Sequence, residues 1–254
     1  MCHQIRTRGA DVDFADQDDV IPWIERLGTP YLEGSYFNDN PKNATHHMMA
    51  RPRVFKSHLT WEERPAGCSY KQIWVFRNCV DMMTSVKHFL PSLWGIDPPL
   101  SEEELCSYLL DAGDVESALR SLASAWEHRQ DADILVLFYE NMEQDHRGTV
   151  EAIAKFMDVL LSMSEVDRIV DQTTKGGMLR NHEVFACRIQ ARNAHKARSI
   201  DFDETKLVGK VRRNINTGMN EDKSDIEAAV QRAWQESVAR TTGMVDYDSM
   251  RLTK

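Results

Sequence analysis

The chain has 254 residues, enough for one large α/β domain, and its 42% hydrophobic and 28% charged residues are ordinary for a globular protein. A formal net charge of −9 disfavours a nucleic-acid binder, which would carry a basic surplus. No apolar run approaches the ~18 residues of a membrane span, and five scattered cysteines without a Cys-x-x-Cys pair indicate reduced thiols in a cytoplasmic protein, not disulfides or a metal site.

Strand-like and helix-like patterns alternate along the first half of the chain. Residues 16–26 predict a short helix, and residues 53–55 predict a short strand. The continuous apolar run at 71–76 predicts a second strand, buried on both faces. Residues 80–90 have apolar side chains at helical spacing, and Pro91 marks the limit of that helix.

The second half continues the alternation. A third strand is predicted over residues 134–138. Helices with an apolar stripe are predicted over residues 115–129, 148–159, 164–172 and 224–240. Residues 175–222 are mostly polar and low in periodicity. The alternation predicts a parallel sheet flanked by helices.

Polar side chains follow each predicted strand. Lys56 and His58 come after the first strand, Arg77 after the second, and Tyr139 after the third, while Ser85 lies on the helix pattern that follows Arg77. Open α/β sheets bind their ligands at the carboxyl ends of their strands. The ordered series therefore predicts a ligand site at this edge.

Lys56 and His58 have a spacing that suits catalysis. Side chains two apart on a strand share one face, so a cation and an imidazole would converge there. Histidine can act as a general base, and lysine can stabilise charge on a transferring group. A surface lysine with a hydrogen-bonded loop histidine is the alternative, and the spacing alone favours it.

Arg77 and Ser85 could clamp a phosphate, although an ion pair between Arg77 and Asp81 is equally compatible with the sequence. Arg212-Arg213-Asn214 suits a dianionic phosphate, but such basic stretches are usually solvated loops. The Tyr139 ring could stack on a flat base or be a buried aromatic residue.

Taken together, these segments resemble the cytosolic-type sulfotransferases over roughly residues 3–240. Residues 52–59 are similar to the family's strand with Lys-[Thr/Ser]-His, and residues 77–86 resemble its Arg-Asn-Pro-x-Asp…Ser segment. Residues 137–142 look like its Phe-Tyr-Glu-Asp-Met stretch, and residues 211–218 are similar to its late Arg-Lys-Gly…Gly motif. The order of these motifs is more specific than any one of them.

The resemblance implies a P-loop-NTPase-like α/β fold, with residues 1–254 forming a single sulfotransferase-like domain. It also implies transfer of a sulfuryl group from 3′-phosphoadenosine 5′-phosphosulfate (PAPS) to the hydroxyl of a small-molecule acceptor, without a metal. His58 would be the catalytic base and Lys56 would assist the sulfuryl group. The residues implied at the nucleotide are Arg77, Ser85, Arg212, Arg213 and Asn214 for the 3′-phosphate, and Tyr139 for the adenine.

The sequence also departs from the family pattern. The family's first strand and its Gly-containing phosphosulfate loop have no counterpart here, so we expect an N-terminally truncated fragment. Cys79 replaces a proline, Arg213 a lysine and Asn214 a glycine. Two alternatives therefore stay open. One is an inactive binder of adenosine 3′,5′-bisphosphate, and the other is a helical interaction protein that uses the stripe of residues 224–240.

Overall fold

The computed structural model divides the chain into two compact units. The first comprises Met1–His58, Ser92–Gly95 and Asp145–Asn214, and the second comprises Leu59–Pro91, Ile96–Gln144 and Ile215–Lys254. The structure describes residues 1–23, 50–64, 70–96, 104, 107–108, 113–209, 211 and 224–253. Among these residues, no helix combines the length and the apolar character needed to cross a membrane.

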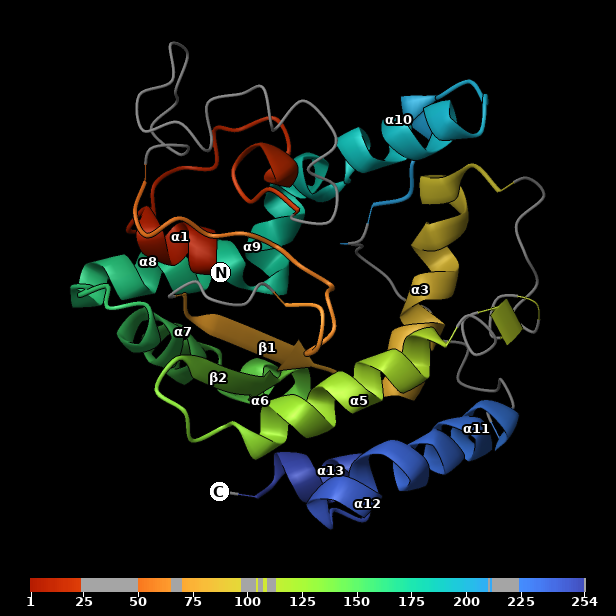
Figure 1. The fold of residues 1–254 in the computed structure, drawn as a ribbon. Coiled ribbons are helices and arrows are strands. Elements are labelled where there is room, and N and C mark those ends of the chain that lie inside the picture. The colour runs from red at the N-terminus through yellow and green to blue at the C-terminus, as the bar shows by residue number, and fades with distance from the viewer. Residues whose placement is uncertain are drawn as a thin grey trace. The chain divides into compact units, whose positions relative to one another are not determined.

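The second unit contains a parallel pair of strands, β1 (Gln72–Phe76) and β2 (Ile134–Phe138). Gln72 lies opposite Ile134 and Phe76 lies opposite Phe138, so both strands end at the same edge (Figure 1). Both strands were predicted from their apolar runs, and both predictions are confirmed. The α/β class with a small parallel sheet flanked by helices is confirmed as well.

Helices accompany the sheet in this unit. Their bounds are α3 (Cys79–Trp94), α5 (Asp114–Glu127), α6 (Tyr139–Gln144), α11 (Ser224–Trp234), the π-helical η5 (Gln235–Ala239), α12 (Arg240–Thr242) and α13 (Tyr247–Arg251). Helix α5 contacts both strands on one side and the α11–α12 segment on the other (Figure 1). It can do so because its Leu119 and Leu122 are almost fully buried, as are Trp234 and Val238 of the opposing segment. Burial of such apolar side chains is the main stabilising contribution here.

Two predictions about this region are wrong. Strand β1 is not buried on both faces, because its residues are mostly half-buried and the Val75 side chain is 50% exposed. Among the described residues β1 pairs with β2 alone, which leaves its other edge without a strand. Helix α3 does not end at Pro91 but continues to Trp94. A proline removes one N–H from a helix, and burial of Leu90 and Leu93 around it favours the continuation.

The first unit is built from short helices. Their bounds are α1 (Cys2–Arg6), α7 (His146–Phe156), α8 (Met163–Thr173), α9 (Lys175–Arg180) and α10 (Arg188–Ala197), with the 3-10 turns η1 (Gln17–Asp19), η3 (His182–Phe185) and η4 (Glu204–Lys206). Helix α1 contacts both α7 and α8, which also contact each other. Ile5, Val150, Ile153 and Ile169 are nearly inaccessible to solvent, so these three helices share an apolar core.

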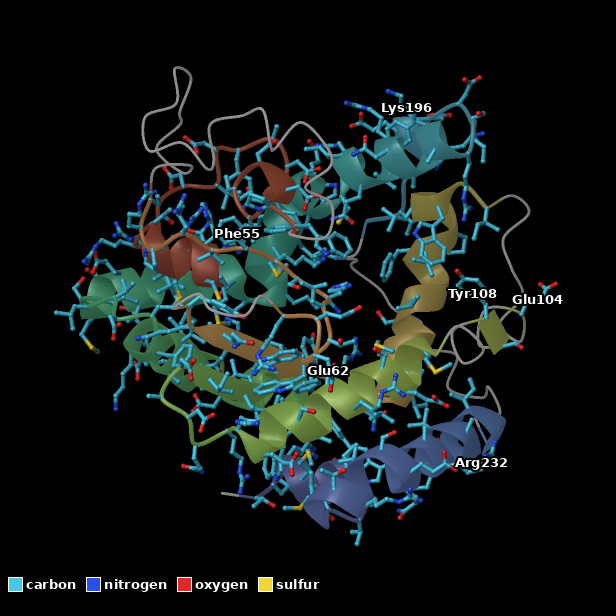
Figure 2. All side chains as sticks on the ribbon, in the orientation of Figure 1. Phe55, Glu62, Glu104, Tyr108, Lys196 and Arg232 are labelled. Atoms are coloured by element: carbon cyan, nitrogen blue, oxygen red, sulfur yellow. The ribbon has the colours of Figure 1, made fainter. Side chains whose placement is uncertain are left out.

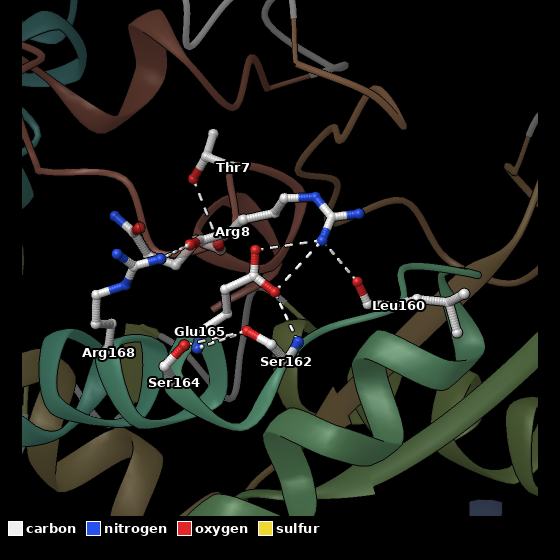
Figure 3. Close-up of polar contacts among 8 residues, drawn as sticks. Thr7, Arg8, Leu160, Ser162, Ser164, Glu165 and Arg168 are labelled. Carbon is white, nitrogen blue, oxygen red and sulfur yellow. Dashed lines mark hydrogen bonds and ion pairs between the residues drawn. The ribbon is translucent and has the colours of Figure 1, made fainter.

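Arg8 ties the chain after α1 to the start of α8 (Figure 3). Its Nη1 donates to the Leu160 carbonyl at 2.7 Å and to Glu165 at 3.3 Å, while Arg168 donates to the Arg8 carbonyl. The Ser162 backbone N–H, the Ser162 hydroxyl and Arg8 lower the pKa of the Glu165 carboxyl. Ser162 and Glu165 form a capping box, which explains why α8 begins at Met163.

Local predictions in this unit fare less well. Of the helix predicted at residues 16–26, the described residues 16–23 form only the turn η1, since Pro22 cannot donate to a helix that continues past it, and residues 24–26 lie outside the described part of the chain. The strand predicted at 53–55 is absent, and only Lys56 pairs, with Trp23, in an isolated parallel bridge. Within the low-periodicity stretch after residue 175, the structure forms α9 and α10.

Candidate functional site

Arg77 occupies the connection between the end of β1 and the start of α3 in the second unit. Its guanidinium carbon lies 4.9 Å from the centroid of the Tyr139 ring, which follows the last residue of β2. Parallel pairing of the two strands places the residues that follow them side by side, so the fold itself brings this cation and this ring together. A guanidinium within about 6 Å of a ring face is attracted to it.

The guanidinium retains hydrogen-bonding capacity. Its Nε is buried and makes no hydrogen bond with any residue in the described part of the chain. Arg77 and Asp81, both of which the structure describes, form no ion pair, so the alternative of a strand-end ion pair receives no support. A buried donor without a partner is rare in proteins, and an anionic ligand would provide one.

Backbone contacts hold the Arg77 connection. The Asn78 N–H donates to Glu140 Oε1 at 3.1 Å, and the Asn78 side-chain oxygen accepts from the Val80 N–H at 2.9 Å, which caps the start of α3. Ser85 lies half-buried on the same helix, one turn after Asp81. The connection therefore presents Arg77 from a fixed backbone.

Tyr139 begins α6 and is held by its own helix. Its hydroxyl donates to Glu143 Oε1 at 2.8 Å, one turn further along. Burial, followed by the neighbouring Glu143 carboxylate, raises the pKa of the Tyr139 phenol. The hydroxyl thus stays protonated at neutral pH, while the ring contacts the Arg77 guanidinium.

Lys56 and His58 lie in the first unit, where both contact the ring of Trp23. The Lys56 ammonium is 4.2 Å from the Trp23 ring centroid, and the His58 and Trp23 ring centroids are 4.6 Å apart in an edge-to-face arrangement. The Lys56 N–H donates to the Pro22 carbonyl at 2.9 Å. The lysine is half-buried and the histidine is exposed. Figure 2 shows the described side chains and labels Phe55, the residue immediately before Lys56.

A buried arginine supports the segments on which Lys56 and Trp23 lie. Arg6 of α1 is 4% exposed. Its guanidinium donates to the Val20 carbonyl at 2.6 Å and to the carbonyls of Ala50 and Pro52 at 3.4 Å. The chain before Trp23 and the chain before Lys56 are thereby tied to the same side chain. Sequence reasoning missed this role of Arg6, because nothing in its spacing signals it.

Three predicted nucleotide-binding residues, Arg212, Arg213 and Asn214, lie outside the described residues. Of the other predicted positions, the structure brings Arg77 and Tyr139 into contact and places Lys56 and His58 around one ring. The contacts of Trp23 were not predicted from the sequence, and Glu140 entered there only within the motif of residues 137–142. Among the described residues, no group of three or more His, Cys, Asp or Glu side chains is arranged to hold a metal ion.

Comparisons with known proteins agree on one family. The family model described as "Sulfotransferase domain" matches residues 2–233. An amine sulfotransferase of Oryctolagus cuniculus is 34% identical over 127 residues, which are 48% of this chain and 42% of that protein. Sulfotransferase 1E1 of Mus musculus is 29% identical over 178 residues, which are 67% of this chain and 58% of that protein. The chain thus spans about half the length of the curated relatives it matches.

Solved structures share the fold. The crystal structure of retinol dehydratase in a complex with retinol and PAP superposes with a TM-score of 0.64 at 16% identity, covering 95% of this chain and 77% of that one. The crystal structure of mouse sulfotransferase SULT7A1 complexed with PAP gives a TM-score of 0.51 at 21% identity, covering 76% and 68%.

Proposed function

This chain belongs to the sulfotransferase family, and from that premise we propose that it transfers a sulfuryl group from PAPS to the hydroxyl of a small-molecule acceptor. The observation that carries the proposal is Arg77. It combines a buried Nε that lacks a partner among the described residues with a position 4.9 Å from the Tyr139 ring, at the carboxyl ends of parallel strands.

The described residues fit a nucleotide with a 3′-phosphate. Arg77 offers a fixed cation with a free donor, and the hydroxyl of Ser85 lies on the helix that follows it. Arginine binds phosphate oxygens through paired hydrogen bonds, which gives both charge and direction. Tyr139 offers a ring to an adenine. We include Arg212, Arg213 and Asn214 in the same proposed site.

We assign the chemistry to the pair at Trp23. His58 would take the proton of the acceptor hydroxyl, and its exposure leaves it accessible to an acceptor. Lys56 would stabilise the negative charge that develops on the transferring group. PAPS supplies the sulfuryl group when it is bound. Because transfer of such groups depends mainly on positioning and charge, the Trp23 contacts of both side chains support the assignment.

The acceptor class and the setting belong to the same proposal. The related structure of retinol dehydratase holds retinol, an apolar alcohol, and by analogy we propose an apolar hydroxyl compound as the acceptor. We propose a cytoplasmic location because the described cysteines Cys2, Cys79 and Cys187 are free thiols. Since one family match runs through residues of both units, we propose that they belong to a single sulfotransferase-like domain.

A second candidate function is nucleotide binding without turnover. It is favoured by the absence of the strand predicted at residues 53–55, since among the described residues an isolated bridge between Lys56 and Trp23 stands in its place. The third hypothesis, a helical interaction protein, loses support because Trp234 and Val238 are buried and their segment contacts α5.

Two measurements on the full chain test the proposal. Calorimetry with adenosine 3′,5′-bisphosphate measures the nucleotide site, and a sulfuryl-transfer assay with PAPS and a set of apolar alcohols measures the chemistry. Binding accompanied by transfer is the expected result. Binding without transfer selects the second candidate, and failure to bind the bisphosphate contradicts both.

A further inference from the structure

We infer that Tyr247, from the C-terminal helix α13, and Glu140 form a positioning pair that fixes Arg77 for the 3′-phosphate of the nucleotide. The inference rests on the proposed function and names residues that would act on the same site without touching the ligand. The family match ends at residue 233, so α13 lies beyond it.

The Glu140 carboxylate connects α13 to the Arg77 connection. Its Oε1 accepts the Asn78 N–H at 3.1 Å, and its Oε2 accepts the Tyr247 hydroxyl at 2.6 Å. The same hydroxyl lies 3.2 Å from the Phe76 carbonyl oxygen. Phe76 and Asn78 are the neighbours of Arg77 on either side, so these contacts hold its backbone from both directions.

The Tyr247 hydroxyl is a dependable donor. Burial, followed by the adjacent Glu140 carboxylate, raises the pKa of the Tyr247 phenol well above its usual range. The phenol therefore keeps its proton at any physiological pH. A hydrogen bond to an ionised carboxylate is stronger than one between neutral groups, and the short distance agrees with that.

The ring of Tyr247 is held independently of its hydroxyl. It lies edge-on to Phe138 with centroids 5.5 Å apart and edge-on to Trp234 at 6.2 Å. A second tie joins α13 to α6, where Asn141 Nδ2 donates to the Arg251 carbonyl at 2.8 Å and Arg251 Nη1 donates to Asn141 Oδ1 at 3.1 Å. Removing the hydroxyl alone should thus leave α13 in place.

The consequence for Arg77 follows from its limited freedom. Its guanidinium meets the Tyr139 ring, and its Nε is buried without a partner in the described part of the chain. A side chain with such a constrained approach binds a phosphate in the right geometry only while its backbone stays in place. Small displacements of positioned groups are costly to ligand recognition.

The test compares two nucleotides by calorimetry on the full chain. Adenosine 5′-phosphate lacks the 3′-phosphate of adenosine 3′,5′-bisphosphate, so the ratio of their dissociation constants measures recognition of that phosphate. For Tyr247→Phe, which keeps the ring, we expect the preference for the bisphosphate to fall by roughly three- to tenfold, the size of one lost hydrogen bond. Glu140→Gln, which keeps an acceptor for Asn78 N–H, should lower it less.

Asn141→Ala is the matched control. It removes the other tie between α13 and α6, so it should lower the melting temperature and leave the nucleotide preference unchanged. If Tyr247 has a merely structural role, Tyr247→Phe and Asn141→Ala should both change the melting temperature, and neither should change the preference for the bisphosphate. That result, or an equal fall of the preference in both variants, would overturn the inference.

The wild-type protein separates this inference from the function on which it rests. If the unaltered chain fails to bind adenosine 3′,5′-bisphosphate, the proposed function is contradicted, and the positioning role falls with it. If the wild type binds with a clear preference for the bisphosphate and Tyr247→Phe retains that preference in full, the positioning role alone is overturned.

Discussion

The two regions that carry the proposed site are built in different ways. In the second unit, Arg77 lies between regular elements, and the carboxylate of Glu140 and the hydroxyl of Tyr247 contact the residues beside it. In the first unit, the described residues 53–58 form no strand. An isolated bridge joins Lys56 to Trp23, and the Trp23 ring contacts both Lys56 and His58. Under the proposed function, nucleotide recognition would therefore depend on backbone geometry at the ends of the strands, whereas the proposed catalytic pair would share contacts with the Trp23 ring. Each can therefore be disrupted without the other.

The largest expected effect is on the chemistry. His58→Ala should lower the rate of sulfuryl transfer by roughly 10²–10⁴-fold, because the acceptor hydroxyl loses its general base. The affinity for adenosine 3′,5′-bisphosphate should not change, since the proposed nucleotide contacts come from other residues. Initial rates with PAPS and calorimetry with the bisphosphate measure the two effects.

His128→Ala is the matched control for that variant. His128 is also exposed and also contacts a tryptophan, although it stacks on Trp61 with centroids 4.5 Å apart, whereas His58 lies edge-on to Trp23. Loss of this histidine should leave the transfer rate within twofold or so of wild type, as is usual for surface substitutions. Unchanged turnover in His58→Ala would remove His58 from the mechanism.

The next largest effect is on nucleotide affinity. Arg77→Ala should weaken binding of adenosine 3′,5′-bisphosphate by roughly ten- to hundredfold, because a charged donor to phosphate is lost. Arg77→Lys should bind the bisphosphate with an affinity between those of the wild type and Arg77→Ala, since lysine keeps the charge but lacks the planar fork and the Nε donor. Calorimetry with the bisphosphate measures each dissociation constant.

Arg129→Ala controls for the loss of a stacked arginine. The Arg129 guanidinium lies 4.3 Å from the Trp126 ring centroid in the same unit, a contact similar to that of Arg77 with Tyr139. It should not alter nucleotide affinity. Equal affinities for wild type and Arg77→Ala would exclude Arg77 from the phosphate site and remove the main support of the proposed function.

Trp23 provides a smaller effect that sharpens the same contrast. Trp23→Leu removes the ring that contacts both Lys56 and His58, and we expect transfer to slow by about tenfold, in keeping with the energies of cation–ring contacts. Nucleotide affinity should stay the same. Phe14→Leu, which removes an aromatic contact with His3 in the same unit, is the control. A parallel loss of nucleotide affinity in Trp23→Leu would show that the two regions are not separable.

The regular elements were the predictable part of the fold. Continuous apolar runs located β1 and β2, and apolar stripes located α5, α7, α8 and α11. Prediction failed where tertiary contacts decide the local structure. Pro91 predicts the end of a helix, yet α3 continues past it to Trp94, because Leu93 beyond it is buried. Residues 53–55 have strand-like side chains, but a strand forms only where another segment pairs with it.

The candidate site was predictable to a similar extent. The order of motifs along the chain singled out Lys56, His58, Arg77 and Tyr139 as candidate residues, and their roles stay predictions. The structure adds the contact of Arg77 with Tyr139 and the contacts of the other two side chains with Trp23. The residues that hold them were not predictable, because each comes from a distant part of the chain. Tyr247 lies about 170 positions from Arg77 along the chain. The Arg6 side chain donates to backbone carbonyls, and such contacts leave no pattern in the sequence. Such contacts depend on the folded arrangement alone.

The smallest expected effect concerns Cys79, which begins α3 beside the Arg77 connection. Burial, followed by the nearby Glu140 charge, raises the pKa of the Cys79 thiol to about 11. At neutral pH the thiol is neutral in both the folded and the unfolded chain, so its contribution to stability is fully present. As pH rises past the ordinary thiol pKa, the unfolded chain releases this proton while the folded chain retains it, and stability falls.

Between about pH 8 and about pH 9.5 we expect a loss of roughly 1 kcal/mol from this group. Urea unfolding at both pH values measures this loss. The free energy of unfolding of Cys79→Ala should fall less than that of the wild type, by that amount. Identical pH dependence in the two proteins would mean that the thiol ionises as readily in the folded chain, and that the start of α3 is more open to water than its burial indicates.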